Sequence, residues 1–175
     1  IPTVAVGFDD LTNPGLGEVL DRHQEYDFFR GIRQEAPYTT SEADAGRLDL
    51  LSHPAWCDGL NELARRNLTF DLLVYAHQLP QAMRGFEQVP DLAVVIDHLG
   101  HPASAADFAT WRAYLEEFAR RVPNSFMKLS GLSFISHDLT DARIRDHVRA
   151  ALDIFGPDRC MVASNHPVDK PAGTY

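Results

Sequence analysis

The chain has 175 residues, 45% of them apolar and 23% charged, a composition typical of one folded domain and unlike that of disordered or fibrous chains. The formal net charge of -9 and the scattering of the 16 basic residues argue against a nucleic-acid partner, because phosphate binding needs clustered Lys and Arg. Two cysteines outside any CxxC pattern, and apolar runs too short to cross a bilayer, predict a cytoplasmic protein without a membrane partner.

Short apolar runs alternate with longer segments of helical period, which indicates parallel strands covered by helices. The expected strands are 3–8, 28–33, 70–75, 92–97, 126–130 and 160–164. The expected helices are 14–26, 54–66, 80–86, a segment after 104, and 140–155. Polar residues before the helices are the expected N-caps, namely Thr12 or Asn13, Ser52, Ser104 with Asp107, and Thr140.

Six parallel strands are too few for a closed eight-stranded barrel, for which about 250 residues are usual. An open doubly wound sheet is the alternative, but no G-x-G-x-x-G turn and no Walker-type lysine loop follows a strand. The chain also begins inside an apolar run and stops where another helix is due. We therefore expect a single α/β domain over residues 1–175 that forms an incomplete (β/α)8 TIM barrel.

Polar side chains follow each of the expected strands. Because all strands of a parallel barrel point the same way, residues at their carboxyl ends meet at one mouth, where barrel enzymes keep their active sites. We expect a functional site built from this set: Asp9, Asp10, Arg33, Gln34, His77, Gln78, Asp97, His98, Lys128, Ser130, Asn165 and His166.

Two histidines of this set carry the chemistry that is easiest to name. His98 follows an apolar strand and precedes a turn, so that it is placed to bind a metal, donate to a carbonyl oxygen or move a proton. The alternative is a histidine packed under the turn. His77 is a second candidate ligand or substrate contact, although His77 and Gln78 can equally cap the turn before Pro80.

Two cations complete the expected mouth. Arg33 suits a carboxylate or lactone carbonyl, and its alternative role is a salt bridge to Glu35 or Asp9. Lys128 lies inside a short apolar strand, where an unpaired ammonium is costly. It is expected either to pair with a carboxylate such as Asp97 or to contact an anionic substrate.

Five segments of the chain resemble motifs of the amidohydrolase-related TIM-barrel family, in its lactonase branch. The run VIDHLGHP at 95–102 resembles LDHxGxP, MKLSGL at 127–132 resembles KLSGL, and FFRGIR at 28–33 resembles F+GVR. FDLLV at 70–74 matches directly, and FGPDRCM at 155–161 with SNHPV at 164–168 is similar to FGpdRlMfgSDWPV. The resemblance covers almost the whole chain, in the family's order.

This resemblance implies that the expected strands are the third to the eighth of the barrel, so that the first two strands and the last helix are absent. The family's first strand typically ends in His-x-His, a motif that the chain does not contain. His98 takes the place of the family's histidine on the sixth strand, and Asn165 that of the aspartate on the eighth. Because an amide cannot accept a proton at neutral pH, either another residue is the base, with His98, His166 and Asp97 as candidates, or the activity differs from that of the family.

The resulting hypothesis is an enzyme that hydrolyses a lactone or similar cyclic ester of a sugar acid or small carboxylic acid. His98 and Asn165 are the expected catalytic residues, and the expected substrate-binding residues are Arg33, His77, Gln78, Lys128 and His166. Either no cofactor or one divalent metal, zinc first, is expected, with His77 and His98 as its ligands. The alternatives are a metal-dependent decarboxylase or amide hydrolase, and a barrel that only binds a small acid; homo-oligomerisation stays open.

Overall fold

The computed structural model describes residues 3–36, 50–102 and 107–173. The strands of these ranges form one sheet in which all pairs are parallel and neighbours follow the sequence order. Every expected strand is present, and its ends lie within two residues of the prediction. The strands are β1 Ala5–Phe8, β2 Phe29–Glu35, β3 Thr69–Leu73, β4 Val94–Ile96, β5 Ser125–Leu129 and β6 Cys160–Val162.

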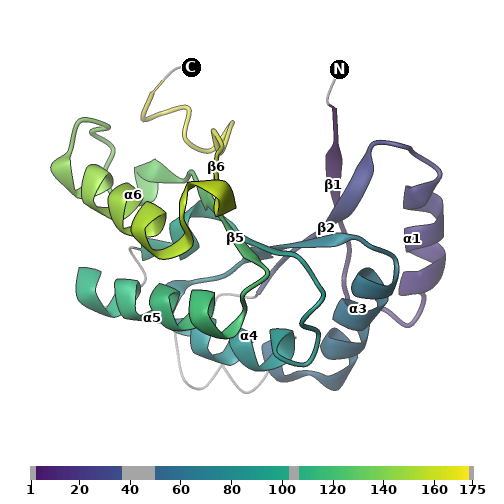
Figure 1. The fold of residues 1–175 in the computed structure, drawn as a ribbon. Coiled ribbons are helices and arrows are strands. Elements are labelled where there is room, and N and C mark those ends of the chain that lie inside the picture. The colour runs from purple at the N-terminus through teal and green to yellow at the C-terminus, as the bar shows by residue number, and fades with distance from the viewer. Residues whose placement is uncertain (1–2, 37–49, 103–106, 174–175) are drawn as a thin grey trace.

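Helices cover one side of the curved sheet, from α1 next to β1 to α6 next to β6 (Figure 1). The α-helices of the described ranges are α1 Leu16–Gln24, α3 Pro54–Arg65, α4 Leu79–Phe86, α5 Phe108–Arg121 and α6 Ala142–Phe155. The side of the sheet that the helices cover is called the outer face below, and the opposite side the inner face. The expected α/β class with a parallel sheet is therefore confirmed.

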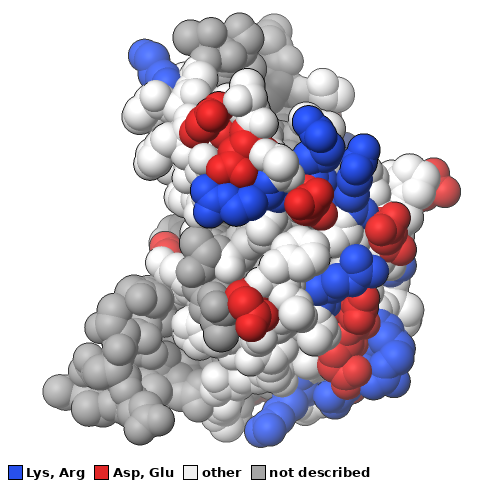
Figure 2. All heavy atoms as spheres, turned by 90° about the vertical axis from the view of Figure 1, so that its left-hand side faces the viewer, with Lys and Arg blue, Asp and Glu red and all other residues white. Residues whose placement is uncertain are grey.

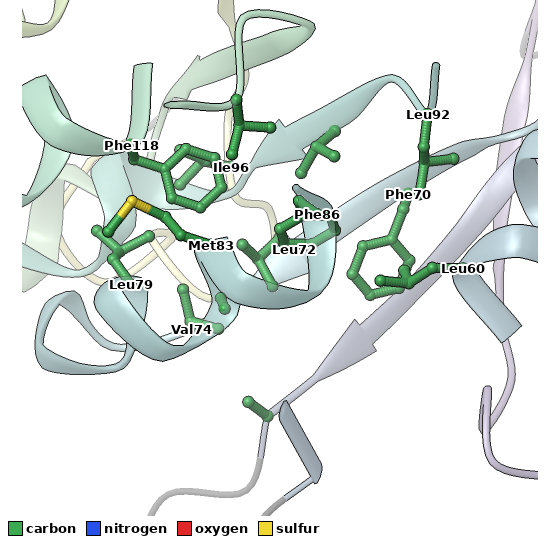
Figure 3. Close-up of a cluster of buried hydrophobic side chains, with 14 of the residues drawn as sticks. Leu60, Phe70, Leu72, Val74, Leu79, Met83, Phe86, Leu92, Ile96 and Phe118 are labelled. Carbon is green, nitrogen blue, oxygen red and sulfur yellow. The ribbon is translucent and has the colours of Figure 1, made fainter. Parts of the chain in front are cut away.

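The main core lies between the outer face of the sheet and the helices (Figure 3). Phe70 and Leu72 of β3 pack there beside Met83 and Phe86 of α4 and Phe118 of α5, each with 2% or less of its surface exposed. Burying a side chain of this size contributes about 1.5–3 kcal/mol to folding. Because successive side chains of a strand point to opposite faces, the residues that alternate with this core are directed to the inner face.

The N-caps of the helices differ from those expected. His53 caps α3, Asp107 caps α5 and Asp141 caps α6, each accepting a backbone N–H of the first turn, while Gly15 precedes α1 without a side-chain cap. The residues expected as caps make other hydrogen bonds: the Thr12 hydroxyl donates to Asp10, Asn13 accepts from Gly15 N, Ser52 accepts from Gln81, and the Thr140 hydroxyl donates to Asp138. Ser104 lies outside the described residues.

Charges of both signs are interspersed over the face of the molecule that carries α5 and α6 (Figure 2). Several of them pair, as Arg112 does with Glu116 and Arg121 does with Glu87. Within the described ranges, no helix has the length and apolar character that a membrane crossing requires.

Candidate active site at the carboxyl ends of the strands

Four charged residues from neighbouring strands form one network on the inner face. Asp71 lies on β3 between the outward-facing Phe70 and Leu72, and the strand register sets it beside Arg33 of β2. Lys128 of β5 donates to Asp71 Oδ2. Lys128 Nζ also lies 2.9 Å from Asp97 Oδ1, and Arg33 Nε lies 2.8 Å from Asp97 Oδ2.

Both carboxylates of this network are removed from solvent, with side-chain exposures of 3% for Asp71 and 0% for Asp97. Burial raises the pKa of Asp71, and the charges of Lys128 and Arg33 oppose that rise. The expected pairing of Lys128 with Asp97 is confirmed. Arg33 pairs with Asp97, and more loosely with Asp71 at 3.6 Å, so the alternative of a rim salt bridge to Glu35 or Asp9 is wrong.

His98 follows β4 in a turn of unusual handedness. The backbone φ angles of His98, Leu99, Gly100 and His101 are 54°, 56°, 63° and 49°, so four successive residues are left-handed. This turn buries the His98 ring and sets its Nδ1 2.8 Å from the hydroxyl of Ser130, which follows β5. Nε2 has no hydrogen-bond partner in the part of the chain that the structure describes. The alternative prediction, a His98 packed under the turn, is therefore confirmed. One nitrogen of its ring is nevertheless left for a hydrogen bond to a substrate.

The His98 ring is neutral at physiological pH. Burial first, then the charges of Arg33 and Lys128, lower the pKa of His98 from 6.5 to about 4, and the charge of Asp169 acts in the opposite direction. A neutral imidazole whose Nδ1 accepts the Ser130 hydroxyl proton carries its own proton on Nε2. In that form His98 is a hydrogen-bond donor.

Aromatic rings line the mouth beside His98. The His101 ring stacks on Phe134 with centroids 4.5 Å apart and lies 5.0 Å from Tyr75. Burial lowers the pKa of His101 to about 4. His77 is exposed beside Tyr75, and Gln78 Oε1 accepts the backbone N–H of Tyr75 at 2.9 Å. The turn-capping alternative for Gln78 is therefore confirmed, and His101 lies beside the site although no role was predicted for it.

Asn165 lies beyond β6 in a left-handed backbone conformation, with φ of 53°. Its side-chain Nδ2 donates to Asp169 Oδ1 at 3.1 Å, and the Ser133 hydroxyl donates to the same oxygen at 2.5 Å. His166 is exposed, and its backbone N–H donates to the Ser164 hydroxyl at 3.2 Å. Asn165 therefore lies on the same rim as His98, because Ser133 belongs to the short turn Leu132–Phe134 whose Phe134 ring is 5.9 Å from that of His98.

Sequence reasoning missed two carboxylates of this site. Asp71 is inside an apolar strand, where its signal was a lone charge in FDLLV that needed a cation as partner. Asp169 comes four residues after Asn165, beyond the residues that directly follow the strand.

The described residues do not fit a metal site on their own. Catalytic zinc needs about three protein ligands, and within residues 3–36, 50–102 and 107–173 no three His, Cys, Asp or Glu side chains are grouped in this way. His77 and His98 stay a prediction for part of such a site.

Comparisons with known proteins agree with the motifs. A model of the amidohydrolase family matches residues 4–175. The protein y4mH of Sinorhizobium fredii is 36% identical over 177 residues, covering 99% of this chain and 59% of that protein. An L-fucono-1,5-lactonase of Burkholderia ambifaria is 33% identical over 149 residues, covering 84% of this chain and 49% of the lactonase. An amidohydrolase of Burkholderia multivorans, crystallised with bound zinc, superposes with a TM-score of 0.85 at 30% identity, covering 99% of this chain and 62% of that one.

The chain spans about half to three-fifths of the length of these two sequence relatives. The six parallel strands of the described residues and their helices correspond to part of the barrel of the zinc-containing structure, so the expected partial barrel is confirmed. Fold, motifs and matched length lead to one conclusion: the chain belongs to the amidohydrolase family.

Proposed function

We propose that the protein hydrolyses a lactone or similar cyclic ester of a sugar acid or small carboxylic acid. The observation that carries the proposal is the buried, neutral His98, anchored through Nδ1 to Ser130 with Nε2 left without a partner in the described ranges. The similarity to L-fucono-1,5-lactonase supports a lactone as the substrate class.

Opening a lactone needs a donor for the oxygen that becomes negative, and an oriented water. His98 Nε2–H supplies the donor, because its hydrogen bond to the carbonyl oxygen becomes stronger as negative charge develops on that oxygen. Asn165 orients the water through its amide. Removing one such donor lowers kcat by about 100- to 1,000-fold in other acyl-transfer enzymes.

The remaining residues of the mouth bind the substrate. The Arg33 side chain is 41% exposed, although its Nε is held by Asp97, so N–H groups on its outer edge are available to a sugar-acid hydroxyl or carboxylate. His77 and His166 are exposed at the rim and offer further polar contacts. Lys128, at 15% exposure, acts on the substrate through its charge more than through contact.

The test is acid release by the full-length protein from a panel of five- and six-membered sugar-acid lactones and aromatic lactones, followed with a pH indicator. We expect turnover of at least one lactone, and a loss of about 100-fold or more in kcat for His98→Gln. His137→Gln, which changes an exposed loop histidine in the same way, is the matched control and should keep full activity. Folded protein that opens no lactone of the panel would refute the proposal.

A metal-dependent amide hydrolase or decarboxylase is the second candidate, and the zinc in the Burkholderia multivorans structure favours it. Metal analysis of the purified full-length protein separates the two. About one firmly bound zinc per chain, with amide or carboxylate substrates turned over only by the metal-loaded form, would support this candidate.

A further inference from the structure

Lactone hydrolysis needs a group that takes a proton from the attacking water, and two of the three expected candidates, Asp97 and His98, do not serve. Asp97 is fully buried, with Lys128 and Arg33 at 2.9 and 2.8 Å from its two oxygens. His98 donates to the carbonyl oxygen in the proposed reaction, so it cannot accept from the water in the same step. Asn165 is an amide and has no basic atom.

Asp169 has the carboxylate that accepts a hydrogen bond from Asn165. Its Oδ1 accepts from Asn165 Nδ2 at 3.1 Å and from the Ser133 hydroxyl at 2.5 Å. Its Oδ2 makes no hydrogen bond or ion pair to the residues that the structure describes. Two donors thus fix the orientation of this half-buried carboxylate and leave its second oxygen available.

There is room for water at Asp169. The residue lines a pocket of about 180 Å³, together with Leu132, Ser164 and His166. About 10–15 Å³ of volume open to the centre of a water-sized sphere is enough for one water, so the pocket has room for the attacking water.

Asp169 also belongs to the same site as His98. Its charge acts on the imidazole, where it opposes the fall of the His98 pKa that burial causes. The two residues flank the loop that runs from Gly131 to Phe134: Ser133 binds Asp169, while a Cβ added at Gly131 would lie 2.6 Å from that of His98.

We propose that Asp169 is the general base of the reaction and replaces, from four residues further along, the carboxylate that Asn165 lacks. The inference rests on the proposed lactone hydrolysis. The water oxygen bonds to the carbonyl carbon while Asp169 Oδ2 takes one of its protons. The ring C–O bond then breaks, and that proton passes to the ring oxygen, so that lactone and water give one hydroxy acid.

This arrangement explains why position 165 carries an amide and not a carboxylate. A carboxylate at position 165 would lie about 3 Å from that of Asp169, and two such groups cannot both be ionised without strong repulsion. An amide donates its N–H to Asp169 instead, and its oxygen can accept the second hydrogen of the water. Asn165 and Asp169 therefore form a complementary pair.

Asp169→Asn in the full-length protein isolates the charge, because the asparagine oxygen still accepts from Asn165 and Ser133. We expect kcat to fall about 100- to 10,000-fold, the range for a lost general base, with KM changed less than about threefold. The double variant Asn165→Asp/Asp169→Asn reverses the pair and should regain at least about tenfold over Asp169→Asn. Asp58→Asn, on the exposed side of α3, is the matched control and should leave kcat unchanged.

Asp169→Ala with added formate gives an independent readout, since a small carboxylate restores turnover only where a base is missing. Retention of a third or more of kcat by Asp169→Asn, in an active wild-type background, overturns this inference alone. Wild-type protein that opens no lactone overturns the proposed function and this inference together.

Discussion

Replacing Lys128 by Met removes one cation from the buried network and keeps the length of the side chain. Asp97 retains Arg33 at 2.8 Å, but Asp71 retains only a distant contact with Arg33 at 3.6 Å. Breaking a buried ion pair by removing one partner costs about 3–5 kcal/mol, because a buried charge is left uncompensated. Since Lys128 is 15% exposed and Arg33 remains, we expect a loss near the lower end, about 3 kcal/mol at pH 7.5.

The loss should depend on pH in a defined direction. Burial already raises the pKa of Asp71 above 3.8, and removal of Lys128 raises it further. A carboxyl whose pKa is raised in the folded state lowers the free energy of unfolding as pH rises from its unfolded-state pKa to its folded-state pKa. Below about pH 4 the carboxyl is protonated in both states and has no such effect. The difference between wild type and Lys128→Met should therefore shrink by about 1 kcal/mol or more between pH 7.5 and pH 5.

Urea unfolding of the full-length protein, followed by the fluorescence of the buried Trp56 and Trp111, measures both quantities. Lys170→Met, which changes an exposed lysine, is the control for stability and should lie within about 0.5 kcal/mol of wild type. Lys128→Met combined with Asp71→Asn should recover most of the loss. A Lys128→Met protein within about 1 kcal/mol of wild type at pH 7.5, with an unchanged pH dependence, would refute the reasoning.

Two further predictions concern His98 and its neighbours. The pKa values of His98 and His101 are lowered from 6.5 to about 4 in the folded protein, so between these pH values the unfolded chain binds protons that the folded chain does not. The free energy of unfolding of the wild type should therefore fall as pH drops from about 6.5 to about 4. A His98→Gln variant that shows the same fall in urea titrations would contradict this. Gly131→Ala should lose about 2–4 kcal/mol and most activity, because its Cβ would lie 2.6 Å from that of His98 at a φ of 65°. Gly156→Ala, at a φ of 76° and a ψ of 159° with nothing within 4 Å of the added Cβ, introduces backbone strain without a clash, and it should lose about 1–3 kcal/mol while keeping its activity. A Gly131→Ala protein with wild-type activity would exclude the clash with His98.

The strands and the main helices followed from the sequence because the apolar period of each segment reports which of its faces is covered. The Lys128–Asp97 pair followed from one rule, that an ammonium in an apolar strand needs a partner. Which carboxylates Arg33 meets did not follow, since that depends on the registers of β2 against β3 and of β3 against β4, and each register is set by packing along the whole strand.

The caps and Asp169 escaped prediction for a related reason. Thr140 and Asp141 are both good capping residues, and the choice between them depends on the Asp138 turn that holds the Thr140 hydroxyl. Asp169 reaches the site because the chain turns back after Asn165, with Asp169 N donating to Asn165 O at 3.2 Å. Neither turn has a sequence signal as strong as an apolar period.

The left-handed turn that carries His98 implies a trade between stability and activity at the mouth. His98, Leu99 and His101 hold a backbone conformation that costs an L-residue roughly 1–2 kcal/mol, and only Gly100 avoids this cost. Glycine or asparagine at the other three positions would fit the backbone better, so engineering for thermal stability would favour them there. A substitution that relieves this strain at position 98 would also remove the imidazole, so the gain in stability there would come with a loss of activity.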